Sequence, residues 1–68
     1  MIQMGELIKK ARKQRGYTQE ELAMMSGFCA RSVRRWENGH VEPSFFNAQV
    51  CLEAMGCSLE NAILMEAA

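Results

Sequence analysis

The sequence has little of the chemistry that enzymes, metal sites and membrane anchors require. Its 68 residues include one histidine and three cysteines, and an odd cysteine count at irregular spacing argues against disulfides and zinc. We expect Cys29, Cys51 and Cys57 to be reduced and mostly buried. No nucleophile–His–acid set or phosphate-binding glycine loop occurs, so no enzyme, cofactor or metal is predicted.

Long apolar runs and a signal-peptide pattern are also missing. No apolar stretch approaches the roughly 18 residues of a membrane span, and no charged-then-apolar leader opens the chain. The expected location is therefore the cytoplasm. At 49% apolar residues the chain can bury a core, and residues 1–68 are predicted to form one domain.

Basic residues are missing from the second half of the chain. All eight lie between Lys9 and Arg35, so the balance through Gly39 is eight basic against four acidic residues, or +4. From His40 onward there are four acidic residues and no basic one, or −4. The net charge of zero therefore conceals a dipole whose basic end can face phosphates.

Short helical patterns fill the chain instead of alternating strand patterns. A stripe of Met4, Ile8, Ala11 and Arg15 predicts a core-facing helix over about 5–15. Two later patterns predict a helix over about 45–55 and a last short helix opened by Ser58. With two more helices between them, the fold class is all-α, a bundle of about five short helices.

The two middle helices lie within Tyr17–Asn38. Thr18 and Glu21 have the spacing of a capping box, and Gly27 is expected to end the first of these helices. The second begins after Cys29, a poor capping residue, and Val33 and Trp36 should anchor it inward.

The outer face of that second helix is basic. Arg31, Arg34, Arg35 and Asn38 stand at spacings of three, four and seven from Arg31, so they share one helical face. A narrow basic helix held by a tight turn suits the DNA major groove.

Taken together, these motifs resemble the Cro/phage-repressor-like (XRE) helix-turn-helix family. The resemblance rests on pieces in the same order and spacing, namely Leu7-Ile8, Ala11-Arg12, Gly16, Thr18-Gln19-Glu20-Glu21-Leu22-Ala23, Gly27, Val33, Trp36-Glu37-Asn38-Gly39, Pro43-Ser44, Gly56 and Ser58-Leu59. It implies a lambda-repressor-like DNA-binding domain with its helix-turn-helix at the second and third helices.

The resemblance also implies roles for single residues. Ala30, Arg31 and Arg35 match positions that usually reach DNA bases, and Arg34 on the flank is a fourth candidate. Arginine pairs bidentately with guanine, so Arg31 and Arg35 are the main candidates for base readout. The expected phosphate contacts are Gln19, Ser32 and Asn38. Arg12 and Glu37 match a family pair that forms an internal salt bridge, so Arg12 is not expected to touch DNA.

Several apolar residues depart from the family pattern. Met24 and Met25 stand at usually polar positions of the second helix, and Phe46 and Val50 at usually polar positions of the fourth. They could fill gaps in a small core, or Phe46 and Val50 could form a homodimer interface. A dimer would place two reading helices one DNA turn apart on a palindromic site.

The function expected from these residues is a sequence-specific regulator of transcription, a repressor that binds double-stranded DNA as a homodimer. Effector control would then need a partner or depend on concentration alone. Two alternatives stay open: a DNA-binding antitoxin whose Met24, Met25 and Phe46 hold a toxin, and a helix-turn-helix fold used only for protein interaction. A thiol at a helix N-terminus can also be reactive, so oxidation of Cys29 could weaken DNA binding.

Overall fold

Five short helices make up the part of the chain that the structure describes. In this computed structural model, which describes residues 3–67, they are α1 (Met4–Arg15), α2 (Gln19–Ser26), α3 (Ala30–Glu37), α4 (Phe45–Ala54) and α5 (Leu59–Ala67). No strand occurs within that range, and the all-α prediction is confirmed. None of the described helices is both long and apolar enough to cross a membrane.

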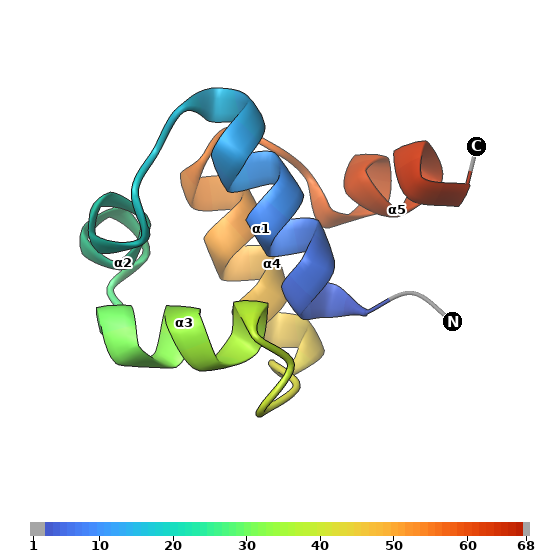
Figure 1. The fold of residues 1–68 in the computed structure, drawn as a ribbon. Helices are drawn as coiled ribbons and strands as arrows, with labels where there is room; N and C mark the ends of the chain where they lie inside the picture. The colour runs from blue at the N-terminus through green and yellow to red at the C-terminus, as the bar shows by residue number, and fades with distance from the viewer. Residues whose placement is uncertain (1–2, 68) are drawn as a thin grey trace.

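The helices pack around α1 and α4, which lie against each other at the centre of Figure 1. α2 and α3 pack on one side of this pair, and α5 packs against it on the other. The largest side chains with no exposed surface come from four different helices: Ile8, Leu22, Val33, Cys51 and Leu52. Burial of each large aliphatic side chain contributes roughly 1.5–3 kcal/mol, so this shared core fixes α3 on the bundle.

Local sequence signals set the ends of α2. The backbone N–H of Glu21 donates to Thr18 Oγ1 at 3.0 Å, and the Thr18 N–H donates to Glu21 Oε1 at 2.8 Å. The capping box is therefore confirmed. Gly27 ends α2 at φ 85°, a left-handed conformation that glycine adopts without steric cost.

The predicted core stripe of α1 is wrong at its last position. Arg15 is exposed, whereas Leu7, which the stripe left out, is buried beside Ile8 and Ala11. The core face of α1 ends at Ala11, and a guanidinium at the end of the helix keeps its charge in water.

One residue expected to be buried, Cys29, and two for which core filling was one of two alternatives, Met24 and Phe46, lie at the surface. Cys29 is exposed, and the residues Met24 and Phe46 are 84% and 69% exposed. The core-filling interpretation of Met24 and Phe46 is therefore wrong. Neighbouring residues already occupy the inward positions, Leu22 on α2 and Ala48 on α4, and the helical period turns Met24 and Phe46 outward.

Candidate nucleic-acid interface

The inner face of α3 is anchored by two apolar side chains. Val33 and Trp36 are both buried, as their spacing of three predicted. The Phe28 ring, from the turn before α3, meets the Trp36 ring edge-on, with centroids 5.1 Å apart and planes at 83°. This packing fixes the rotation of α3 about its axis, and so decides which residues face outward.

The end of α3 also approaches the start of α1 very closely at Gly5. A Cβ atom at Gly5 would overlap the carbonyl oxygen of Trp36 and lie 2.8 Å from its carbonyl carbon. Only a residue without a side chain fits this crossing. No role was predicted for Gly5 from the sequence, although a glycine inside a helix pattern is a signal of close backbone approach.

A buried ion pair joins α1 to the last residue of α3. Arg12 donates from Nε to Glu37 Oε2 at 2.8 Å and from Nη2 to Glu37 Oε1 at 2.9 Å, and their side chains are only 12% and 1% exposed. Arg12 Nη1 donates to the Tyr17 carbonyl at 2.9 Å, and Gln19 Nε2 donates to Glu37 Oε1 at 3.1 Å. The hydrogen bond with Glu37 raises the pKa of Arg12. The expected Arg12–Glu37 pair is thus present, and Arg12 is fully used inside the protein.

The outer face of α3 carries the three exposed arginines. Arg34 Nη1 lies 3.2 Å from Glu20 Oε2, an ion pair between side chains that are 47% and 68% exposed. The guanidinium groups of Arg31 and Arg35 make no hydrogen bond or ion pair with any residue that the structure describes. Two of the three arginines are therefore available to a ligand without breaking an internal contact.

The expected phosphate contacts lie in different surroundings. Asn38 is exposed just after α3, whereas Gln19 is half-buried and holds Glu37. Ser32 is half-buried, with Oγ 3.2 Å from Cys29 Sγ, and Ala30 packs partly against the core. Asn38 is therefore the most accessible of the three candidate phosphate contacts.

The cysteines differ in their chemistry. Hydrogen bonding by Ser32 lowers the pKa of the exposed Cys29 thiol, whereas burial raises the pKa of Cys51 to about 11.

No group of three or more potential metal ligands gathers among the described residues. Cys29 also gives α3 no side-chain cap. That oxidation of Cys29 weakens DNA binding stays a prediction. Measuring DNA affinity before and after mild peroxide treatment would test it.

Comparison with known protein families adds independent information. The sequence matches a family model described as helix-turn-helix over residues 8–61, from the first turns of α1 to the start of α5. The match includes all of α2 and α3, together with the turn between them. No curated protein sequence matches the chain.

Proposed function

The chain belongs to the Cro-like (XRE) family of helix-turn-helix DNA-binding proteins, and we propose that it acts as a sequence-specific transcriptional repressor. In this proposal residues 1–68 work as one non-catalytic DNA-binding domain, and α3 enters the major groove. A repressor of this kind acts by covering the promoter rather than by chemistry.

The observation that carries the proposal is the pair of unpartnered guanidiniums on α3. Arg31 and Arg35 stand four residues apart on the exposed face of a helix whose other face is buried. Each can pair with O6 and N7 of a guanine, which is worth roughly 1–3 kcal/mol of discrimination against a wrong base. Arg34 and Ala30 are secondary candidates for base contacts. To contact DNA, Arg34 would have to give up its ion pair with Glu20.

Phosphate contacts supply the sequence-independent part of the affinity in this proposal. Asn38 follows α3 directly, Ser32 lies in the first turn of α3, and Gln19 is the first residue of α2. At these places side-chain and backbone donors can meet the DNA backbone. The +4 balance of residues 1–39 supports the same orientation, with the acidic second half turned away. Affinity should therefore fall steeply with salt.

We also propose that the protein binds a palindromic operator as a homodimer through α4. Phe46 is 69% exposed, and Val50, half-buried, lies one helical turn further along α4. Apolar side chains so placed gain most from covering each other in a second copy. Phe46→Glu should give a folded monomer with weaker operator binding, while Met24→Glu, the same change on α2, should leave the dimer intact. A parent protein that is already monomeric at high concentration in sedimentation would refute the dimer.

Selection of binding sites from random double-stranded DNA tests the main proposal. We expect an enriched palindrome with guanines in each half-site and half-site centres roughly 34 Å apart, one turn of DNA. An enriched site without two-fold symmetry would support sequence-specific DNA binding but would contradict the proposed homodimer. A complete, salt-insensitive lack of binding would instead favour a helix-turn-helix used only for protein interaction.

A second candidate is a DNA-binding antitoxin. The exposure of Met24, Met25 and Phe46 favours it, because a toxin could cover these side chains. Co-purification with the product of a neighbouring toxin gene would support this function. The two candidates share the same DNA-binding face and differ in what covers the apolar side chains.

A further inference from the structure

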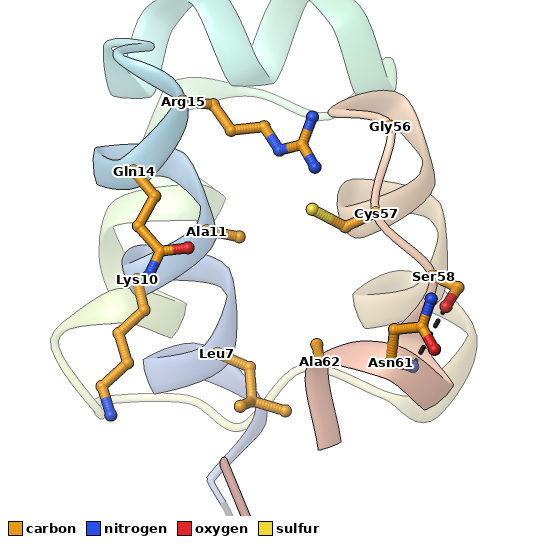
Figure 2. Close-up of a pocket in the computed structure, with 10 residues that line it drawn as sticks. All are labelled: Leu7, Lys10, Ala11, Gln14, Arg15, Gly56, Cys57, Ser58, Asn61 and Ala62. Carbon is orange, nitrogen blue, oxygen red and sulfur yellow. Dashed lines mark hydrogen bonds between the residues drawn. The ribbon is translucent and has the colours of Figure 1, made fainter. Parts of the chain in front are cut away.

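A pocket of about 220 Å³ lies between α1 and the start of α5, apart from the outer face of α3. Figure 2 shows its two walls, with Gln14 and Arg15 on the α1 side and Cys57 and Asn61 on the other. Leu7 and Ala62 close its lower end. No DNA contact proposed above uses any of these residues.

The pocket is positively charged. The Arg15 side chain points into it and lies against Gly56, where a Cβ atom would stand 3.3 Å from Arg15 Nη1 (Figure 2). This guanidinium makes no hydrogen bond or ion pair with a described residue. The stem of Lys10 also lines the pocket, but its ammonium group points away from the cavity (Figure 2), and none of the described residues that line the pocket is acidic. An anion placed here meets the Arg15 guanidinium and no opposing carboxylate among the described lining residues.

The rest of the lining limits the size and character of a ligand. Leu7, Ala11 and Ala62 give an apolar surface that a hydrocarbon group can cover. The volume lies below the ~300–1,000 Å³ of sites for drug-sized molecules, so the occupant must be small. A ligand that matches the whole pocket has one anionic end and a short apolar body.

We propose that this pocket binds a small organic carboxylate. Arg15 would receive the carboxylate through two parallel N–H···O bonds, the geometry in which guanidinium recognises planar anions best. The first turn of α5 lines the same space, and there Ser58 Oγ accepts a hydrogen bond from the Asn61 N–H at 3.0 Å. The dipole of α5 favours negative charge at this N-terminal end of the helix. The apolar body of the ligand lies on Leu7, Ala11 and Ala62.

Binding at this site would join three parts of the fold. The pocket is lined by α1 from Leu7 to Arg15, by the turn after α4 and by the first turn of α5, so an occupant ties α5 to the bundle. The chain would then have an effector site of its own, in addition to the control by a partner or by concentration that was expected from the sequence. The site is independent of the proposed DNA contacts.

The direct experiment is a titration of ¹⁵N-labelled protein, without DNA, with benzoate and with benzamide, its neutral counterpart of the same shape. Benzoate should shift the amide signals of Gly56, Cys57 and Asn61 in a saturable way, and benzamide should bind at least about tenfold more weakly. Equal binding of the two compounds, or benzoate shifts confined to α2 and α3, would overturn the proposal.

Two variants and a control locate the binding energy. Arg15→Gln should weaken benzoate binding about tenfold, because a hydrogen-bonded charge is lost, and Ala62→Leu should fill the apolar end and block binding. Lys13→Gln removes the same charge from α1 outside the pocket and should change nothing. Equal losses in Arg15→Gln and Lys13→Gln would mean non-specific attraction and refute the site. Because no DNA is present, failure here is separate from failure of the repressor proposal.

Discussion

The two faces of α3 use the same pair of residue types with opposite results. On the inner face Glu37 meets Arg12 with almost no solvent access, and on the outer face Glu20 meets Arg34 with both side chains largely exposed. Burial makes the first pair costly to break, because removing either partner leaves the other charge buried and unpaired. Exposure leaves the second pair weak and exchangeable.

This difference separates stability from recognition within one helix of eight residues. The inner face of α3 is tied down by Val33, Trp36 and the Glu37 ion pair. The outer face keeps Arg31 and Arg35 without internal partners, so their charges remain available for DNA. Substitutions on the two faces should therefore change different measurements.

The largest effect is expected at the buried ion pair. Arg12→Ala should lower the free energy of unfolding by about 3–5 kcal/mol, because it strands the buried carboxylate of Glu37. Urea denaturation followed by circular dichroism measures this loss. Lys13→Ala, at the exposed next position of α1, should change it by less than about 0.5 kcal/mol. Similar losses in both variants would break the comparison.

The next effect concerns the contact of α1 with the end of α3. In an open helix Gly→Ala stabilises by roughly 1 kcal/mol, but at Gly5 the new methyl group would strike the Trp36 carbonyl. Gly5→Ala should therefore destabilise the fold by about 1–3 kcal/mol or more. Thermal unfolding decides the sign, with Gln14→Ala on exposed α1 surface as control. A stabilised Gly5→Ala would show that the two backbones are not in contact.

On the outer face the effect should move from stability to affinity. Arg31→Ala and Arg35→Ala should each cost roughly 1–3 kcal/mol of specific DNA binding while unfolding changes by less than about 0.5 kcal/mol. Fluorescence anisotropy with the selected site, beside a urea titration, gives both numbers. If either variant loses as much stability as Arg12→Ala, the two faces do not have separate roles.

A smaller gain is expected where α3 begins. Cys29 makes no side-chain cap, and Cys29→Ser would supply an oxygen acceptor for the first turn. We expect a gain of about 0.5–1 kcal/mol in unfolding free energy. Cys29→Ala, which also lacks a capping oxygen, should match the parent. Equal stability of all three would mean that the cap contributes nothing here.

The smallest effect is expected at the exposed ion pair. Glu20→Ala should change the free energy of unfolding by only about 0–1 kcal/mol, since both partners are well solvated. High salt should remove whatever difference remains in the urea titration. A loss as large as that of Arg12→Ala would show that burial does not decide the strength of these pairs.

Features encoded by neighbouring residues could be predicted from the sequence. The Thr18–Glu21 capping box, the Gly27 stop and the inward-facing Val33 and Trp36 all depend on spacings of a few residues. The Arg12–Glu37 pair, 25 residues apart, could be expected only from the family resemblance. The additional hydrogen bond from Gln19 to Glu37 was not predicted from the sequence.

Features that depend on how helices cross could not be predicted. Which arginine finds a partner depends on the packing of α2 against α3, which places Glu20 beside Arg34 rather than beside Arg31 or Arg35. The role of Gly5 follows from the crossing of α1 and α3, and the pocket from where α5 meets α1. Patterns of neighbouring residues in the sequence do not determine the distances between helices on which these features depend.

The most direct test of the central claim pairs one protein change with one DNA change. Affinities of the parent and of Arg35→Ala are measured for the selected operator and for the same operator with its half-site guanines replaced one at a time. We expect one guanine whose replacement weakens the parent roughly 10–100-fold but leaves Arg35→Ala nearly unchanged. Equal losses for both proteins at every guanine would contradict base reading by the outer face of α3.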